Sequence, residues 1–141
     1  MASLRLEIVT AERLILTEDD VAKVTIPGAD GELTILPRHA SLITLLRPGE
    51  LRVTRRGVEV NLAVSGGFVE VHDSHVRVLA DSAERAEEID VARAQAAEQR
   101  ASALMADRSR LTDLPAAASA LRRSRVRLKV ARRRRGGPLA G

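Results

Sequence analysis

Three charged side chains in the stretch ERAEEIDVARAQAAEQRA, from Glu84 to Ala101, have types and spacing suited to holding an anion. Asp90, Arg93 and Arg100 fall within an arc of about 80° if the stretch is helical. Two guanidinium groups offer planar, permanently charged forks to a phosphate, and a carboxylate accepts a hydrogen bond from an amino group such as that of adenine. The alternative is a solvated helix face on which Asp90 and Arg93 form an ordinary i,i+3 ion pair.

The other reactive side chains lack the partners that catalysis or metal binding needs. His72 and His75 form a His-x-x-His pattern, but they flank Asp73-Ser74, which is typical of a hairpin turn, and the sequence has no cysteine and only one further histidine to complete a zinc site. That histidine, His39, has no serine or carboxylate placed by spacing to make it a catalytic base. The glycines do not form the phosphate loop GxxxxGK[ST]. The sequence therefore predicts a chain that is not catalytic by itself and holds no metal.

The composition fits one ordinary domain, or a small domain with an appendage, in a chain of 141 residues that is 45% hydrophobic. Phe68 is the only aromatic residue, so the core must be built from Val, Ile, Leu and Ala. The absence of cysteine excludes disulfides and is compatible with a reducing compartment. No apolar run approaches the ~18 residues of a membrane span, and no signal-peptide pattern opens the chain, so we expect a protein that is soluble or held at a membrane only through partners.

The charge differs between the two parts of the chain. Residues 1–80 carry nine basic and eleven acidic side chains, whereas residues 81–141 carry fourteen basic and eight acidic ones. The segment from Arg122 to Arg135 holds nine Arg or Lys in fourteen positions and no acid. It is a solvated face, a nucleic-acid-binding segment or a surface that docks on an acidic protein. Nucleic-acid modules usually add aromatic stacking, which a single Phe cannot supply.

The first eighty residues alternate apolar and polar side chains in short segments, which is typical of strands with one buried face. The segments are Leu4–Val9, Val21–Ile26, Glu32–Leu36, Leu51–Thr54, Val58–Val64, Phe68–Val71 and His75–Leu79. Turn sequences such as Arg56-Gly57, Gly66-Gly67 and Asp73-Ser74 separate them. This pattern predicts an all-β N-terminal sandwich or flattened barrel.

Apolar residues recur at helical spacing after Asp81, in two segments with a break near residues 107–113. They are Ile89, Ala92, Ala96 and Ala103, then Leu114, Ala118, Leu121 and Leu128, with Asp113 as the candidate N-cap of the second segment. Alanine-rich stripes allow two helices to approach closely as a C-terminal antiparallel hairpin, but they bury little apolar area, so we expect marginal stability. The predicted organisation is therefore a β-sandwich domain at 1–83, a helical hairpin at 84–131 and a basic, disordered tail at 132–141.

Three motifs in this order resemble the epsilon subunit of bacterial F-type ATP synthases: GELTILPRHASLITLLRPGELRV, AVSGGFVEV and VLADSAERAEEIDVARA. The resemblance runs from about Leu6 to Val130. It implies a non-catalytic subunit of the central rotor stalk, which couples proton translocation to ATP synthesis on the cytoplasmic face of the cell membrane. The implied partners are the gamma subunit, the c-subunit ring and, transiently, the alpha/beta catalytic head, with membrane association only through the complex and no nucleic acid. It also implies that the hairpin can extend and inhibit ATP hydrolysis.

The resemblance also implies an ATP-binding role for the opening stretch. Some bacterial epsilon subunits bind ATP through an Ile/Leu-Asp-x-x-Arg-Ala motif, which Ile89-Asp90-Val91-Ala92-Arg93-Ala94 matches. At the family's spacing, further participants are Glu84, Arg100, Arg123 and Arg127. ATP is thus expected as a regulatory ligand that holds the hairpin folded, and no tightly bound cofactor is expected.

Four residues are implied as partner contacts. In the resembling family the acidic residue at Glu32 faces the c ring and the loop of His39 contacts the gamma subunit, while Arg122 and Arg125 belong to the basic helix that docks on the catalytic head. The alternative function, from another class, is a small nucleic-acid-binding adaptor that acts through the basic C-terminal tail.

Overall fold

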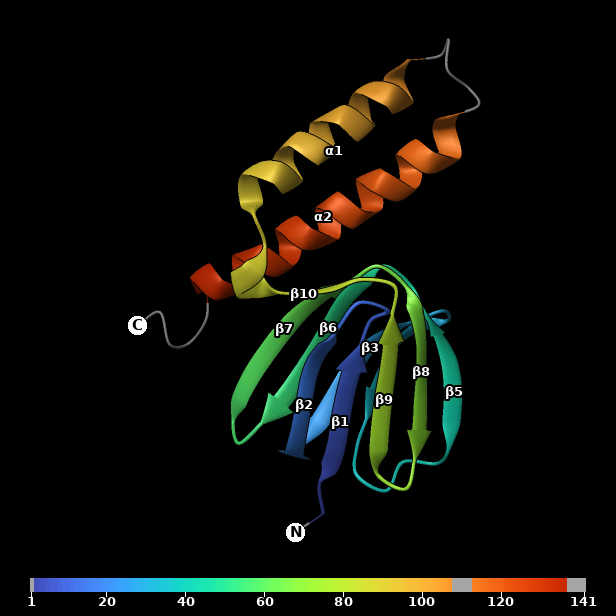
Figure 1. Ribbon diagram of the computed structural model, residues 1–141, viewed down its shortest axis with the longest axis vertical. Helices are drawn as coiled ribbons and strands as arrows, with labels where there is room; N and C mark the ends of the chain where they lie inside the picture. The colour runs from blue at the N-terminus through green and yellow to red at the C-terminus, as the bar shows by residue number, and fades with distance from the viewer. Residues whose placement is uncertain (1, 108–112, 137–141) are drawn as a thin grey trace. The chain divides into compact units, whose positions relative to one another are not determined.

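The computed structural model describes residues 2–107 and 113–136, and the chain divides into two compact units, Met1–Arg85 and Ala86–Gly141 (Figure 1). The first unit is made of strands and the second of helices. Each unit is described by itself below.

The first unit is a ten-stranded antiparallel sheet that curls into a nearly closed sandwich, as predicted. Its strands are β1 (Leu4–Val9), β2 (Leu14–Val21), β3 (Lys23–Gly28), β4 (Gly31–Ile35), β5 (Leu42–Leu46), β6 (Gly49–Arg55), β7 (Val58–Val64), β8 (Gly67–His72), β9 (His75–Ala80) and β10 (Ala83–Arg85). They are ordered β10-β7-β6-β3-β5-β8-β9-β1-β2, with β4 paired to β3. The exception to antiparallel pairing is β1 with β9, which run parallel.

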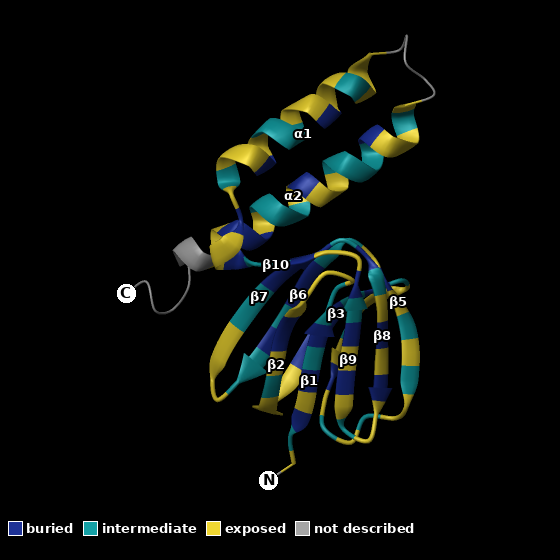
Figure 2. Ribbon diagram, viewed as in Figure 1, coloured by how far each residue is buried: buried dark blue, intermediate teal, exposed yellow. Residues whose placement is uncertain are grey.

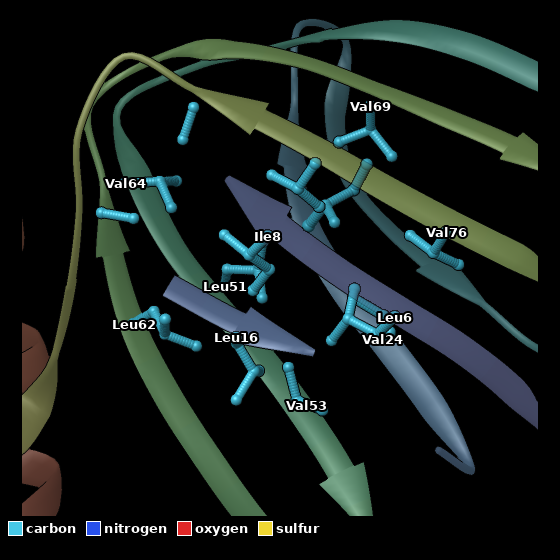
Figure 3. Packing of buried hydrophobic residues seen from close by; sticks show 14 of the residues in the cluster. Leu6, Ile8, Leu16, Val24, Leu51, Val53, Leu62, Val64, Val69 and Val76 are labelled. Carbon is cyan, nitrogen blue, oxygen red and sulfur yellow. The ribbon is translucent and has the colours of Figure 1, made fainter. Parts of the chain in front are cut away.

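The core lies between the inner faces of the curled sheet and is aliphatic throughout. Figure 3 shows Leu6, Ile8, Val24 and Leu51 pointing into the same space, and each is at most 1% exposed. Phe68 takes no part in this core, because 43% of its surface is exposed. Branched aliphatic side chains suit such a core because they fill a pleated, two-sheet interior closely without rings.

Three strands were not predicted from the sequence. In β2, the sequence LILTEDDV buries the adjacent Ile15 and Leu16 and then runs through four polar residues, so it lacks the alternation that marks a strand. In β5, the sequence LITLL reads as an apolar run, although Ile43 and Leu45 point outward. The third, β10, has three residues, which is too few for a periodic signal.

The free edge of β2 is covered by arginine side chains from strands at the other end of the sheet order. Arg85 donates from Nη2 to the carbonyl oxygen of Ile15 at 3.0 Å. Arg55 donates from Nε to the carbonyl oxygen of Asp19 at 2.8 Å and lies 3.4 Å from a carboxylate oxygen of Glu18. These contacts occupy backbone groups that an edge strand would otherwise leave open.

A tight turn fixes the register of the hairpin formed by β8 and β9. Asp73 and Ser74 have φ values of 49° and 61°, and the flanking His72 and His75 pair directly, which confirms the predicted hairpin turn. Positive φ at both central positions is the signature of a type I′ turn, whose twist matches that of the strands.

The second unit comprises a short 3-10 helix, η1 (Ala86–Glu88), and the helices α1 (Val91–Ala106) and α2 (Leu114–Gly136), which form the predicted hairpin. The residues at the interface between α1 and α2 are small. They are Ala94 and Ala101 on α1, and Ala117, Ser124 and Ala131 on α2, all at most 3% exposed and spaced by seven (Figure 2). We call them the small-residue interface. Such residues allow close approach but bury little apolar area.

The predicted stripe on the first helix was wrong in phase. Ala92 and Ala103 are exposed, whereas Ala94 and Ala101 are buried. Ile89 is buried but precedes the first residue of α1, so it could not set the phase of the helix. When alanine occurs on several faces of a helix, its spacing predicts a helix but does not show which face packs against the neighbouring helix.

The predicted tail from residue 132 also needs correction, because α2 continues to Gly136. The buried Val130 and Ala131 keep this end of the helix packed. The rest of the predicted tail, residues 137–141, lies outside the described residues, as does most of the predicted break, at 108–112. Neither described helix combines the length and the apolar composition needed to cross a membrane.

Candidate functional site

Asp90 is the N-cap of α1. Its backbone is extended, with φ −80° and ψ 101°, and its Oδ1 accepts a hydrogen bond from the backbone N–H of Arg93 at 3.1 Å. Within the described residues, Asp90 and Arg93 form no side-chain ion pair of the i,i+3 kind. The carboxylate thus satisfies one of the open N–H groups at the helix start and lies at the positive end of the helix dipole.

One ion pair identifies which edges of α1 and α2 meet. Arg125 Nε lies 3.7 Å from Glu98 Oε2. Glu98 is four positions after the buried Ala94 of α1, and Arg125 is one position after the buried Ser124 of α2. At about 100° per residue, both side chains are turned in the same direction from the small-residue interface. Because the helices are antiparallel, this direction brings both side chains to the same side of the hairpin.

The opposite edge of the hairpin gathers arginines from both helices. Arg93 and Arg100 each precede a buried alanine by one position, and Arg123 precedes Ser124 by one, which turns all three toward this edge. Arg127, three positions after Ser124, shares it. We call Arg93, Arg100, Arg123 and Arg127 the arginine edge.

The arginine edge is compact along the hairpin axis. The Glu98–Arg125 pair sets the levels of the two helices, so Arg100 lies level with Arg123, and Arg127 falls between Arg100 and Arg93. The whole set spans the seven-residue separation between Arg93 and Arg100, about 10 Å at 1.5 Å per residue. Arg93, Arg100 and Arg123 are exposed, and Arg123 is oriented by a 2.7 Å hydrogen bond from Nη1 to the hydroxyl of Ser119. Clustered guanidinium groups on one open edge favour an anion with several phosphate oxygens.

Two other predicted ligand residues lie away from this edge. Glu84 lies in β10, paired with Ala63 in the first unit, so it is not among the residues that the hairpin itself brings together. Ile89 is 2% exposed and is a packing residue of the second unit.

A second basic surface lies on the other side of α2. Arg122 and Arg125 are exposed, and helical periodicity places Lys129, Arg132 and Arg133 on the same side, at about 80–180° from Arg123 and about 120–160° from Arg127. We call these five residues the basic stripe. On α2, the residues predicted to bind a nucleotide and those predicted to contact a partner therefore point to different sides of the helix.

In the sequence, Glu32 and His39 lie on either side of Ile35, which is the buried last residue of β4. Glu32 is the second residue after the β3–β4 turn, and its side chain is 61% exposed and accepts a 2.9 Å hydrogen bond from Arg52 Nη2. The loop of His39 is tied to the β8–β9 turn, because the backbone N–H of Arg38 donates to Ser74 Oγ at 2.9 Å. His39 itself is half-buried, with Nδ1 2.7 Å from the carbonyl oxygen of Ala40.

The His-x-x-His pair lines a shallow pocket of about 210 Å³ with Glu70, Asp73 and Arg77. His72 Nε2 lies 3.1 Å from a carboxylate oxygen of Asp73, and its Nδ1 lies 3.1 Å from Ser41 Oγ. In the part of the chain that the structure describes, no three His, Cys, Asp or Glu side chains are arranged to hold a metal ion.

An outward-facing apolar row crosses five neighbouring strands and was missed in the sequence. Consecutive cross-strand pairs join Leu45 on β5 to Phe68 on β8, Leu79 on β9, Val9 on β1 and Leu14 on β2 (Figure 1). Leu45, Phe68 and Leu14 are 64%, 43% and 58% exposed. We call these five residues the apolar row. Period-two patterning treats every apolar position as buried, and two of the strands that carry the row were not predicted.

Both units match models of known protein families. Residues 3–86 match the model described as ATP synthase, Delta/Epsilon chain, beta-sandwich domain, and residues 87–132 match the one described as ATP synthase, Delta/Epsilon chain, long alpha-helix domain. Curated relatives named ATP synthase epsilon chain cover almost the whole chain. That of Dehalococcoides mccartyi is 55% identical over 98% of this chain and 99% of its own length, and that of Herpetosiphon aurantiacus is 51% identical over 94% and 96%.

Solved structures share the fold. A chain in the cryo-EM structure of the Euglena gracilis mitochondrial ATP synthase, OSCP/F1/c-ring, aligns with a TM-score of 0.70 at 25% identity, covering 96% of this chain and 81% of that one. A chain in the Tetrahymena thermophila mitochondrial ATP synthase, central stalk and c-ring, aligns with a TM-score of 0.62 at 18% identity, covering 92% and 96%. The matches extend over both units and favour the stalk-subunit interpretation over the nucleic-acid-binding adaptor.

Proposed function

Because this chain belongs to the ATP synthase delta/epsilon family, as an epsilon chain of the central stalk, we propose that its helical hairpin senses ATP and controls ATP hydrolysis by the complex. The observation that carries the proposal is the arginine edge, which joins arginines of α1 and α2 on one open side of the hairpin. A ligand held by both helices at once binds the folded hairpin and not the extended chain.

The phosphates of ATP bind the arginine edge, since Arg93 and Arg100 come from one helix and Arg123 and Arg127 from the other. Asp90 lies at the same end as Arg93 and keeps one carboxylate oxygen beyond the Oδ1 that caps the helix. That oxygen accepts a hydrogen bond from the amino group of the base.

ATP binding stabilises the folded hairpin by linkage. A ligand at ten times its Kd adds about 1.4 kcal/mol to the folded form. This is a large increment for an interface made of alanine and serine, so ATP level sets the fraction of extended hairpin. When ATP is scarce, the hairpin extends, and the basic stripe with Arg122 and Arg125 docks on the alpha/beta catalytic head and inhibits hydrolysis.

The first unit holds the subunit in the stalk on the cytoplasmic face of the bacterial cell membrane. In this proposal the apolar row and the loop of His39 contact the gamma subunit, and Glu32 contacts the c ring. An outward row of aliphatic and aromatic side chains is typical of a protein–protein interface and is costly to leave in water.

Isothermal titration calorimetry with ATP on the full chain tests the proposal. We expect saturable heat below millimolar ATP and a loss of at least tenfold in affinity for Arg93→Ala, because each charge-assisted contact to phosphate contributes about 1.5–3 kcal/mol. Arg125→Ala is the matched control: it removes an arginine of the same hairpin from the opposite edge and should leave the affinity unchanged. An absence of heat at millimolar ATP, or equal effects of both variants, would refute the site.

A further inference from the structure

The outer face formed by β4, β3, β6 and β7 carries a chain of polar contacts that the proposed function does not use. Arg52 on β6 donates from Nη2 to Glu32 Oε1 at 2.9 Å, and its Nη1 lies 3.8 Å from Glu50 Oε1. Asn61 on β7 donates from Nδ2 toward Glu50 Oε2 at 3.5 Å and toward Glu59 Oε2 at 3.3 Å. Arg52 is thus held between two carboxylates from different strands.

Exposure rises in order along this chain. The side chain of Glu50 is 4% exposed, that of Arg52 is 29% exposed and that of Glu32 is 61% exposed. A buried carboxylate fixes the guanidinium, which in turn fixes a carboxylate at the surface. An exposed glutamate side chain, with its three rotatable bonds, would otherwise sample many conformations.

The strand register explains why Arg52 reaches both carboxylates. It lies opposite Asn61 on β7 and opposite Thr25 on β3, at the centre of this face. The next strand, β4, is fixed against β3 by the Thr25–Thr34 hydroxyl pair at 3.1 Å. A planar guanidinium can direct separate N–H groups to two acceptors, whereas a lysine ammonium at the end of a flexible stem holds neither in a fixed direction.

We propose that Arg52 is a positioning residue that presents the Glu32 carboxylate to a hydrogen-bond donor or cation on the partner in the stalk. The proposal rests on the proposed function, in which Glu32 contacts the c ring. Arg52 occupies Oε1, leaves most of the Glu32 side-chain surface open and lowers the local negative charge, so the partner meets one oriented oxygen atom.

Rebinding of the full-length chain to ATP synthase stripped of its epsilon chain tests the proposal through a double-mutant cycle. We expect Glu32→Gln and Arg52→Met each to weaken binding by about tenfold, the size of one charge-assisted hydrogen bond. In the Glu32→Gln background, Arg52→Met should cost less than about twofold, because Arg52 acts through Glu32. Arg52→Lys should recover only part of the loss.

Arg56→Met is the matched control, since Arg56 forms a 3.2 Å exposed pair with Asp20 next to the same strand and makes no contact with Glu32. It should leave rebinding unchanged. Loss of Arg52 beside the buried Glu50 is also expected to lower the stability of the fold. The melting temperature of each variant therefore distinguishes weaker binding caused by loss of stability from weaker binding caused by a misplaced Glu32 carboxylate.

The possible failures are distinguishable. If Glu32→Gln weakens binding and Arg52→Met does not, the positioning role is wrong while the contact at Glu32 stands. Losses that add in the double variant would assign Arg52 a purely structural role. If Glu32→Gln itself leaves rebinding unchanged, the contact of Glu32 in the proposed function is wrong, and the positioning role falls with it.

Discussion

A single carboxylate has two uses at the start of α1. The Oδ1 atom of Asp90 caps the helix, and the proposed ATP site uses the other oxygen. The sequence motif suggested a ligand residue on the helix face, whereas the structure gives Asp90 a local role first. The cap at Asp90 was not predicted, although Asp is among the preferred N-cap residues and residues 91–101 are rich in alanine and other helix-forming residues.

Asp90→Ala should therefore lower the stability of the hairpin by about 1 kcal/mol and weaken ATP binding as well. Asp90→Ser keeps an N-cap acceptor but has only one side-chain oxygen, so we expect near-normal stability with weakened ATP binding. Hydrogen exchange at the Arg93 amide measures the cap, and calorimetry measures the ligand. Equal loss of amide protection in both variants would contradict this division of roles.

The elements show what one sequence can and cannot predict. The strands β1 and β7 were predicted with their observed bounds, because an apolar residue occupies every second position of each sequence. In β1 these positions are the buried ones, whereas in β7 burial is confined to the consecutive residues Leu62, Ala63 and Val64. The strands β2 and β5 were missed because outward Leu14, Ile43 and Leu45 break that alternation, and they do so where a partner surface is proposed. Departures from simple patterning are expected at such surfaces.

The helix pair was predicted, but the face that packs was not. Alanine is common on both sides of α1, so only tertiary contact distinguishes the buried Ala101 from the exposed Ala103. For the same reason, the sequence did not show that the residues of the arginine edge share one side of the hairpin. The residues themselves were inferred from a family resemblance, and their common side follows only from the small-residue interface.

Ala101→Leu should open the hairpin, because a larger side chain at a close-packed position typically costs about 1–3 kcal/mol and this interface of small residues buries little apolar area. Ala103→Leu adds the same atoms to an exposed position of the same helix and should leave the hairpin intact. Hydrogen exchange of the amides in α1 and α2 reports the difference, with weaker ATP binding in Ala101→Leu. Equal protection in the two variants would show that the interface is not closely packed.

At the scale of the whole molecule, the first unit has two contrasting outer faces. The face of β4, β3, β6 and β7 is a polar network centred on Arg52, and the face of β5, β8, β9, β1 and β2 carries the apolar row. This contrast between the two faces cannot be read from the amino-acid composition, because it depends on which strands are neighbours in the sheet.

Leu45→Asp should weaken binding to the gamma subunit by tenfold or more, because burying an exposed leucine contributes about 1.5–3 kcal/mol. The side chain is already 64% exposed, so the melting temperature of the free chain should change little. Val58→Asp, at a residue that is 51% exposed but outside the apolar row, is the control. Comparable binding of both variants to purified gamma subunit would place the contact elsewhere on the sandwich.

The arginines that cover the edge of β2 have a consequence before the subunit joins its complex. An uncovered strand edge would let copies of the free chain pair strand to strand into aggregates. With Arg55 and Arg85 already bonded to the carbonyl oxygens of that edge, a second copy meets occupied groups there. The contacts that close the sandwich are therefore expected to limit edge-to-edge aggregation of the free subunit before assembly.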